Sequence, residues 1–555
     1  MENTPITLET IEAAERLVGV NYTREERELM LDGLDGQIEE ARARRALTLE
    51  NHVPPASRFD PRLPGFRPPP PQAPVRACVT DPGPLPDSDE DIAFAPVTSL
   101  SWWIARGDLT SRRLTEIYLD RIEAHAARLE CFVTVTPELA RAQADAADAL
   151  LRAGTRLGPL HGIPYGLKDL FDTSGILTTW GAAPYRDRVP DGDARVVELL
   201  RSAGAVLLGK TTLGALAYGE VWFGGKTRNP WNLDEGSSGS SAGSASATAA
   251  GLCAFSIGTE TLGSITAPSQ RCGTTGLRPT FGRVSRAGGM ALCWSLDKVG
   301  PICRSVEDCA LVLAAINGPD PADRSSIGAP FNFDATRDVA GLRIGYLPAT
   351  FEDDGATDVD RAALEATRRL GVEVVEVALP DLPYGSLMSM LFAEAAAAFE
   401  ELTLTDRDDE LVRQDKGAWP NAFRQARFLS AVDHVQLDRL RYRVMQALDA
   451  TFREVDAMIG PFGTGPMLVA SNFTGHPCLH LRAGFLESPT RGDPSLEGGK
   501  LDIGSAAESA ESHEVPQGIS LWGPLFDEGR LLNLGMALEA ELGVAARRPD
   551  LQPDD

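Results

Sequence analysis

Residues 236–251 read GSSGSSAGSASATAAG, and an apolar run at 253–258 leads from them into the turn sequence GTETLGS at 258–264. So much glycine and serine is typical of a flexible linker, or of a helix of small residues that packs closely against its neighbours. The pattern favours the helix, because Gly251 is a typical helix stop and a buried strand follows it at once. We therefore expect a small-residue helix at 245–250 in the interior of the fold.

The turn at 258–264 predicts a site for a negatively charged oxygen. A glycine-rich turn after a strand can expose successive backbone N–H groups in one direction, and such a nest stabilises an oxyanion. Ser264 ends the turn and would lie beside this nest. A Gly-Ser turn is by itself also typical of an ordinary loop, and a serine becomes a nucleophile only when a base takes its proton.

The base that the sequence offers is a lysine. His161 is the only histidine near these segments, whereas Lys168 lies among apolar residues in the run 162–172. Burial disfavours a charged amine, so a lysine in this place could accept a proton near neutral pH. The local sequence also allows an ion pair between Lys168 and Asp169 or Asp172, and taken alone it favours that pair.

Lysine is rare in this chain, which draws attention to the positions that keep it. Only six of the 53 basic residues are lysines, and Lys168, Lys210 and Lys226 lie close together in the sequence. Arginine cannot release its proton at any accessible pH, whereas a buried lysine can. A lysine in this chain can therefore mark a position where arginine would not serve.

Short apolar runs alternate with helical patterns over much of the remaining chain. A helix is expected at 358–370, and residues 486–515, rich in Gly, Ser, Glu and Pro, are expected to form a surface loop. The expected strands cover residues 205–209, 254–258, 342–346 and 372–377. Alternation of this kind favours an α/β fold with helices on both faces of a sheet.

Two segments precede this α/β region. Residues 7–47 predict two amphipathic helices, and Thr23 and Glu26 form a capping-box pattern at the start of the second. Residues 54–86 hold 12 of the 39 prolines, which excludes a helix or a central strand there. We therefore divide the chain into a helical arm (1–50), a proline-rich linker (51–94) and a catalytic domain (95–555).

The arm is expected to lie on the body of the protein. Isolated short helices are marginal in water, and their apolar faces need a surface to cover them. Leu31, Leu34 and Ile38 share one face of the second expected helix. We expect this face to pack on the catalytic domain.

These motifs together resemble the amidase signature family, which consists of serine hydrolases with a Ser–cis-Ser–Lys triad. The resemblance covers roughly residues 95–485 and resumes over 515–545. It is carried above all by GIPYGLKDLFDTSGILTTWGA (162–182), GSSAGSASATAAG (239–251), GTETLGS (258–264) and CGTTGLRPTFGRVSRAG (272–288). The resemblance implies a mixed central β-sheet covered by helices on both faces.

The resemblance also implies a role for individual residues. Lys168 stands at the position of the catalytic lysine, Ser240 at that of the serine with a cis peptide bond, and Ser264 at that of the nucleophile. The implied oxyanion hole consists of the backbone N–H groups of Thr261, Leu262, Gly263 and Ser264. We expect a substrate pocket lined by Tyr218, Phe223, Ser241 and Leu262.

Three residues around the nucleophile depart from the family pattern D-T-G-G-S-I-R. Leu262 replaces a glycine and should narrow or reshape the pocket. Glu260 replaces an aspartate and Thr266 replaces an arginine, so a supporting ion pair should be rearranged. Because all three triad positions are intact, these departures bear on the substrate and leave the chemistry unchanged.

The resemblance implies an amidohydrolase that cleaves a small-molecule amide, with esters and carbamates as further substrates, through an acyl-enzyme. One alternative is the glutamine-amidase (A-type) subunit of a tRNA-dependent amidotransferase. This alternative is linked to a second resemblance, because residues 6–60 are similar to the small C subunit of that enzyme. Another alternative is a non-catalytic binding scaffold, which the intact triad positions disfavour.

Composition narrows the partners and the location. The net charge of −26 disfavours direct nucleic-acid binding. Eight scattered cysteines without a C-x-x-C pair, and histidines without a ligand pattern, predict no metal site and no cofactor. No long apolar run and no signal peptide are apparent, so we expect a cytoplasmic protein with no membrane contact. We expect a small-molecule amide as its partner and allow for a homodimer.

Overall fold

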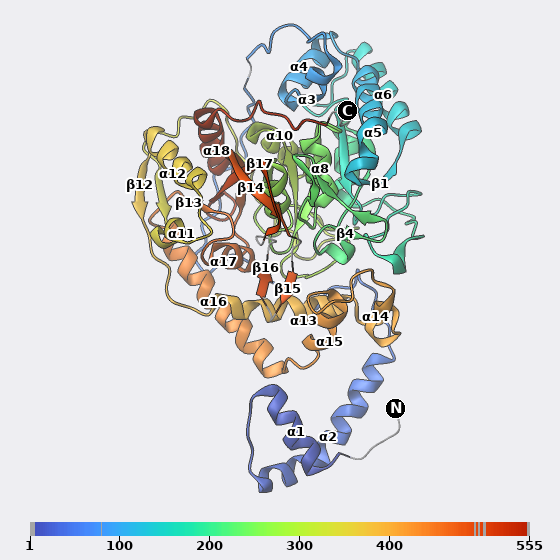
Figure 1. Ribbon diagram of the computed structural model, residues 1–555, viewed down its shortest axis with the longest axis vertical. Coiled ribbons are helices and arrows are strands. Elements are labelled where there is room, and N and C mark those ends of the chain that lie inside the picture. Colours follow the sequence, from blue (N-terminus) through green and yellow to red (C-terminus); the bar gives the residue numbers. More distant parts are fainter. Residues whose placement is uncertain (1–5, 79, 493–494, 498–499, 503–506, 552–555) are drawn as a thin grey trace.

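A large mixed sheet organises the body of the protein (Figure 1). The computed structural model describes residues 6–78, 80–492, 495–497, 500–502 and 507–551. The sheet has eleven strands in the order β1-β3-β2-β8-β10-β9-β14-β17-β13-β11-β12. These are β1 (Phe132–Val135), β2 (Pro164–Lys168), β3 (Val206–Thr211), β8 (Phe255–Glu260), β9 (Thr275–Arg278), β10 (Lys298–Cys303), β11 (Arg343–Tyr346), β12 (Glu373–Glu376), β13 (Ala457–Pro461), β14 (Cys478–Arg491) and β17 (Ala507–Trp522).

The sheet is mixed: two groups of parallel strands flank an antiparallel middle, and the edge strand β1 pairs antiparallel with β3. Strand β2 runs parallel to β3 and β8, and β11 runs parallel to β12 and β13. The strands between them, from β8 through β17 to β13, pair antiparallel. Two-stranded pieces lie outside the sheet: β4 (Val221–Trp222) with β5 (Gly225–Lys226), β6 (Arg228–Asn229) with β7 (Asn232–Gly236), and β15 (Ser495–Glu497) with β16 (Lys500–Asp502).

Helices cover the sheet on both faces, which confirms the expected α/β architecture (Figure 1). The helices of the body are α3 (Asp89–Phe94), α4 (Val97–Arg106), α5 (Ser111–Leu129), α6 (Pro137–Arg152), α7 (Arg195–Ser202), α8 (Ala242–Ala249), α9 (Thr266–Cys272), α10 (Val306–Ile316), α11 (Pro348–Glu352), α12 (Asp358–Arg369), α13 (Met388–Ala398), α14 (Glu400–Leu404), α15 (Trp419–Ala426), α16 (Ala431–Phe452), α17 (Met467–Thr474) and α18 (Glu528–Leu542). Among the described residues, none of the helices combines the length and the hydropathy that crossing a bilayer needs.

The small-residue stretch forms the helix that the sequence predicts. Every residue of α8 is buried, and the helix lies against β2, β3, β8 and β10. A side chain at Gly243 would collide with the carbonyl of Cys131, so the close approach requires glycine there. Gly251 follows the helix with φ 65°, as a helix stop predicts. This packing fixes the loop before α8, which contains Ser240, against the centre of the sheet.

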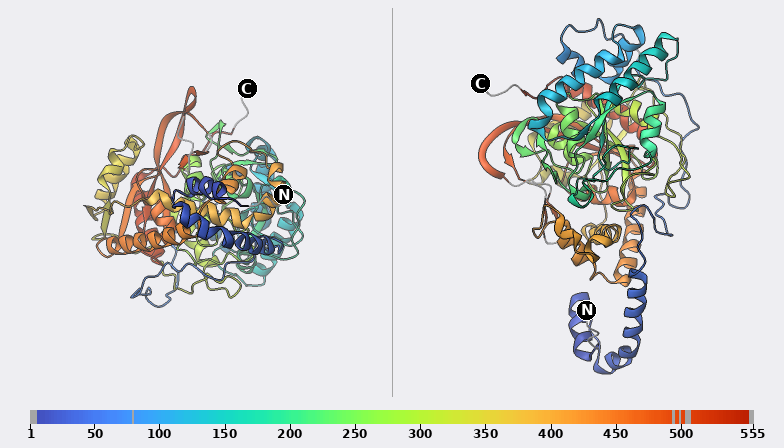
Figure 2. Two further views of the ribbon diagram at one scale, coloured as in Figure 1. Left: turned by 90° about the horizontal axis from the view of Figure 1, so that it is seen from below. Right: turned by 90° about the vertical axis from the view of Figure 1, so that its right-hand side faces the viewer.

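The arm consists of α1 (Leu8–Val18) and α2 (Arg24–Arg45), and it projects from the body (Figure 2). The expected capping box of Thr23 and Glu26 is present. Our expectation that this arm lies on the body is not met, because the two helices cover each other. Ile11 is buried between them, and Glu15 accepts two 2.7 Å hydrogen bonds from Arg27.

The segment after the arm runs across the body as an extended strap, residues 51–62. At its start the Asn51 side chain accepts a hydrogen bond from the N–H of Ala291 (2.8 Å) and donates to the carbonyl of Ala398 (3.2 Å). Further along, the ring of Phe59 lies 3.3 Å from the guanidinium carbon of Arg441. The strap is therefore fixed to the body, while the domain boundaries at residues 50 and 94 stay a prediction.

Residues 486–515, expected to be a loop, largely form strands. Strands β14 and β17 pair along their length and extend beyond the sheet as a hairpin, although residues 493–494, 498–499 and 503–506 lie outside the described residues. Among the described residues of the hairpin, Glu487, Pro489, Glu511 and Ser512 are exposed, which fits the polar composition, whereas Thr490 is buried. Composition alone cannot distinguish such strands from a loop.

Candidate active site

Lys168 ends β2 and is completely buried at the centre of the body. Its Nζ lies 2.8 Å from the Oγ of Ser240, 3.0 Å from the Oγ of Ser241 and 2.9 Å from the Oγ1 of Thr259. Burial lowers the pKa of Lys168 well below its usual 10.5, although the charges of Asp297 and Glu260 oppose this change. The environment therefore favours a neutral amine held by three hydroxyl groups.

The neighbouring aspartates do not pair with Lys168, although the local sequence allowed it. Asp169 lies 3.2 Å from the Nζ of Lys210, and Asp172 lies 2.7 Å from the guanidinium of Arg188. Each carboxylate thus has another cation as its partner. The ion-pair alternative for Lys168 is excluded by this geometry, and Lys210 is a second buried lysine whose charge is matched.

Ser240 and Ser264 are brought to the same place by two adjacent segments. The peptide bond between Gly239 and Ser240 is cis, as the resemblance implies. The N–H of Ser241 donates to the carbonyl of Ser264 (3.1 Å), which joins the loop before α8 to the turn after β8. The side chain of Ser264 is only 8% exposed and lines a cavity together with Gly239.

The turn at 261–264 has free backbone donors. Within the described part of the chain, the N–H groups of these four residues donate to no protein acceptor. Gly263 has φ 84°, a conformation that glycine adopts without strain. The turn therefore offers unpaired N–H groups beside Ser264, as an oxyanion hole requires.

A buried ion pair supports this turn in place of the one that the sequence lacks. Glu260 accepts hydrogen bonds from the N–H groups of Ile265 and Thr266, both at 2.9 Å, and from the guanidinium of Arg278 at 2.7 Å. Burial acts to raise the pKa of Glu260, but the charge and hydrogen bond of Arg278 outweigh it and lower the pKa to about 2. In this chain Arg278 supplies the cation beside Glu260, and a rearrangement relative to the family pattern stays a prediction.

A small apolar cavity of about 60 Å³ opens beside Ser264. Tyr218 and Leu262 line it, as we expected. The other lining residues come from the serine turns and from helices far along the chain: Ala217, Gly219, Ser238, Gly239, Thr261, Gly263, Ser264, Ala267, Leu292, Met388, Leu391, Phe392, Trp419 and Leu468. The contribution of α13 and α15 was missed, and only the apolar run 388–392 could have indicated it.

Phe223 and Ser241, which we also expected in the pocket, lie elsewhere. The ring of Phe223 packs against Trp222, with centroids 5.0 Å apart, and its N–H donates to the carbonyl of Gly181. The hydroxyl of Ser241 contacts Lys168 and donates to the carbonyl of Thr259 (3.1 Å). Ser241 thus supports the lysine and does not face the cavity.

A second, larger cavity of about 810 Å³ meets the first at Ala217, Thr261 and Leu292. The strap forms one of its walls, and loop 286–299 forms another. Unlike the small cavity, it is lined by charged side chains, including those of Arg286, Asp297, Lys298, Glu394 and Arg441. Ser264 therefore has an apolar space on one side and a charged space close by.

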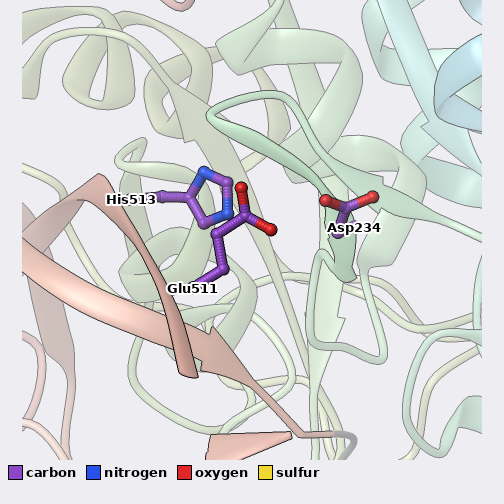
Figure 3. Close-up of side chains that lie close together, drawn as sticks. All are labelled: Asp234, Glu511 and His513. Carbon is purple, nitrogen blue, oxygen red and sulfur yellow. The ribbon is translucent and has the colours of Figure 1, made fainter. Parts of the chain in front are cut away.

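One group of side chains has a composition that could hold a metal ion. Asp234 of β7 lies near Glu511 and His513 of β17, with possible ligand atoms within 4.8 Å of one another (Figure 3). Asp234 and Glu511 are exposed, and His513 is half-buried. None of the three belongs to the residues around Lys168, so the chemistry at Ser264 does not depend on this group.

The chain is similar to known proteins along most of its length. A family model described as Amidase matches residues 113–532. The A subunit of glutamyl-tRNA(Gln) amidotransferase from Roseiflexus sp. (strain RS-1) is 37% identical over 478 residues, which cover 81% of this chain and 96% of that protein. Two solved structures are each 30% identical and match 82% of this chain. The native peptide amidase of Stenotrophomonas maltophilia has a TM-score of 0.69 over 98% of its chain. A chain from a vestigial protein complex, described as revealing the evolutionary origins of an s-triazine catabolic enzyme, has a TM-score of 0.70 over 100% of its length.

These relatives correct the partners that we expected. The expected set, a small-molecule amide with no direct nucleic-acid contact and a possible homodimer, is wrong, because the curated relatives are named as one subunit of an amidotransferase for glutamyl-tRNA(Gln). The net charge of −26 describes this chain's own surface and carries no information about partner subunits. The Amidase model spans more than half of the chain, and a relative at 37% identity covers 81% of it, so the chain belongs to the amidase signature family of amide-cleaving hydrolases.

Proposed function

We propose that this chain hydrolyses a carboxamide through an acyl-enzyme on Ser264, and that it does so as the A-type subunit of a tRNA-dependent amidotransferase. The observation that carries the mechanism is the buried Lys168, which has hydroxyl partners and no carboxylate partner among the described residues. The role as a subunit is supported by the curated relatives, which match 81% of the chain.

The hydrogen-bond inventory of Lys168 supports a proton relay through Ser240. A neutral amine has two N–H donors and one lone pair. The Ser241 hydroxyl is committed as a donor to the carbonyl of Thr259, so it accepts from Lys168. The Oγ1 of Thr259 is the second acceptor, at 2.9 Å. The lone pair is thereby left for the hydroxyl proton of Ser240, at 2.8 Å.

In the first half-reaction the proton of Ser264 moves to Ser240 as the Ser240 proton moves to Lys168. The Oγ of Ser264 then attacks the carboxamide carbon, and the oxyanion accepts hydrogen bonds from the N–H groups of Thr261, Leu262, Gly263 and Ser264. The C–N bond breaks, and the leaving nitrogen receives the proton back through Ser240. Water hydrolyses the resulting ester by the same relay and releases the acid.

The arm and strap fit the proposal of a fused subunit. The resemblance of residues 6–60 to the small C subunit of the amidotransferase is part of this proposal, and the hydrogen bonds of Asn51 to the body support it. We retain the division into arm (1–50), linker (51–94) and catalytic domain (95–555) as part of this proposal. A fusion would hold the small subunit next to the catalytic domain in every copy of the chain.

A glutaminase assay tests this proposal. The full chain is incubated with L-glutamine, alone and with the remaining subunits of a tRNA-dependent amidotransferase and glutamyl-tRNA(Gln), and ammonia and glutamyl-tRNA amidation are measured. We expect glutamine hydrolysis that depends on Ser264, and amidation only with the other subunits. Labelling of Ser264 by a fluorophosphonate without any glutamine hydrolysis would refute the subunit role and leave the mechanism standing.

One observation favours a second candidate, cleavage of a peptide carboxamide. The small cavity at Ser264 has no charged side chain among its described lining residues, whereas glutamine carries an ammonium and a carboxylate. An apolar wall suits the side chain of a peptide, and a solved relative is a peptide amidase. Glutamine would have to place its charges in the larger cavity. Comparing kcat/KM for glutamine and for a set of peptide amides separates the two candidates.

A further inference from the structure

A second carboxylate besides Glu260, that of Asp297, is hydrogen-bonded to the turn at 261–264. Asp297 immediately precedes β10 and is buried. One of its oxygens accepts a 2.6 Å hydrogen bond from the hydroxyl of Thr261, the first residue of the turn. The other accepts from the N–H groups of Leu292 and Cys293, at 2.8 and 3.0 Å. The carboxylate thus connects the turn to the loop that separates the two cavities.

Within the part of the chain that the structure describes, the Asp297 carboxylate has no cation as a direct partner, although Arg286 donates to the backbone carbonyl of Asp297 at 3.5 Å. Among the described residues it forms no salt bridge, because Arg286 is paired with Asp323 at 2.9 Å and the Nζ of Lys298 donates to the carbonyl of Leu296. Burial raises the pKa of Asp297, and the Thr261 hydroxyl opposes this change. Three donors around a buried carboxylate stabilise its ionised form. Its hydrogen bonds are therefore directed at the turn and its adjoining loop.

We propose that Asp297 is a positioning residue, which fixes the first N–H group of the oxyanion hole through the hydroxyl of Thr261. This inference rests on the proposed acyl transfer at Ser264. Glu260 holds the turn just after Ser264, and Asp297 holds it at Thr261, so the four N–H groups lie between two fixed ends. A displacement of about 1 Å in a catalytic group can cost about 100-fold in rate.

The charge of Asp297 has a second effect, which a merely structural residue would not have. Asp297 and Glu260 are the two charges that oppose the effect of burial on the pKa of Lys168. The cations near them are Lys298, Arg286 and Arg278, and Arg278 is paired with Glu260. Removing the negative charge at Asp297 should lower the pKa of Lys168 further, so that the neutral base is present at lower pH.

The test uses a substrate-independent probe, a fluorophosphonate, whose oxygen occupies the oxyanion hole as it reacts with Ser264. Thr261→Val removes the hydroxyl and keeps the size of the side chain nearly constant. Thr261→Ser keeps the hydroxyl and removes only the methyl group. We expect Thr261→Val to react about tenfold more slowly, less than the roughly 100-fold loss of a whole oxyanion donor. Thr261→Ser should stay within about twofold of the parent, because it keeps the hydroxyl.

Asp297→Asn and the double variant complete the test. Asp297→Asn should react at least as slowly as Thr261→Val, and its pH profile should rise at lower pH, whereas that of Thr261→Val should not shift. The double variant should be no slower than Asp297→Asn, because both changes remove one interaction. Equal rates for Thr261→Val and the parent would overturn the inference, as would an unshifted profile for Asp297→Asn. If the parent is not labelled, the proposed function itself fails. Should Asp297→Asn not fold, the two Thr261 variants still decide.

Discussion

The proposed catalytic centre and the arm differ in the partners of their charged side chains. The centre surrounds a lysine with neutral hydroxyl groups, whereas the arm pairs charged side chains with each other. At the centre, Lys168 is buried and held by neutral hydroxyls, with its charge suppressed by burial. In the arm, charged side chains pair with each other, as the buried Glu15 does with Arg27, and apolar Leu29 is 85% exposed. The centre therefore depends on the whole surrounding fold, and the arm depends mainly on itself. Changes at the centre should abolish chemistry without unfolding the protein, and changes in the arm should leave the chemistry intact.

The largest effect is expected from Ser264→Ala. Loss of the nucleophile of a serine hydrolase costs about 10⁶-fold in kcat. The side chain is small and its hydroxyl faces a cavity, so the melting temperature should change little. Turnover and thermal unfolding are measured on the same preparation. Activity near that of the parent protein would remove Ser264 from the mechanism.

The next largest effect is expected from Lys168→Arg, which tests whether Lys168 accepts a proton or only supplies a positive charge. Arginine keeps the charge but cannot accept a proton, so Lys168→Arg should lose about 10⁴-fold in kcat, as much as Lys168→Ala. Lys226→Arg serves as the matched control, because Lys226 is half-buried on β5, away from the serines. It should leave the kinetics unchanged. Substantial activity in Lys168→Arg would show that the lysine works as a cation.

The pH dependence of kcat/KM should show a smaller effect, which reports directly on whether Lys168 is neutral in the active enzyme. The base must be neutral in the free enzyme, so kcat/KM should rise with pH and become constant above the pKa of Lys168. Because burial lowers that pKa, the plateau should begin below pH 10.5, the usual value for lysine. The profile is measured with the full chain and an amide substrate. A rise that continues beyond pH 10.5 would contradict a buried neutral lysine.

The sequence indicated which residues the structure brings together at the proposed centre, because they belong to local motifs. Lys168, Ser240 and Ser264 lie at the ends of strands or in turns whose neighbours identify them. The sequence did not indicate the pocket walls, because Leu391 and Trp419 reach Ser264 from more than 120 residues away. Ordinary apolar helix residues carry no sign of which cavity they face. The same limit applies to Phe223, whose aromatic ring packs on Trp222 instead of a substrate.

The arm shows a different limit. The sequence predicted both helices, and even the capping box at Thr23, because these features are local. It did not predict where the apolar face would pack, since Leu31, Leu34 and Ile38 are equally suited to the body, a partner or the other helix. In the structure these three side chains remain half-buried. Helix formation follows from local pattern, whereas docking depends on a surface elsewhere.

The smallest effect is expected from deleting the arm alone, residues 1–46. One contact of α2 with the body is the ion pair of Arg44 with Glu400, whose side chains are 45% and 21% exposed. Such a surface pair contributes about 0–1 kcal/mol to stability. For a body of this size that corresponds to a shift of about 2 °C or less in melting temperature. Turnover should be unchanged, because the triad lies beyond residue 160.

Deleting residues 1–62 is the comparison for the 1–46 deletion, because it removes the strap as well as the arm. The hydrogen bonds of Asn51 to Ala291 and Ala398 and the contact of Phe59 with Arg441 would then be lost, and the larger cavity would open to solvent. We expect a clearly larger drop in melting temperature than for the 1–46 deletion, because residues 286–299 would lose their contacts with the strap. The strap, residues 286–299 and Thr261 all line the larger cavity. A large drop already at the 1–46 deletion would mean that the arm packs on the body in solution, as its amphipathic pattern predicts. Equal stability of both deletions would mean that the strap contributes nothing to the body, and the distinction between a self-contained arm and an attached strap would fail.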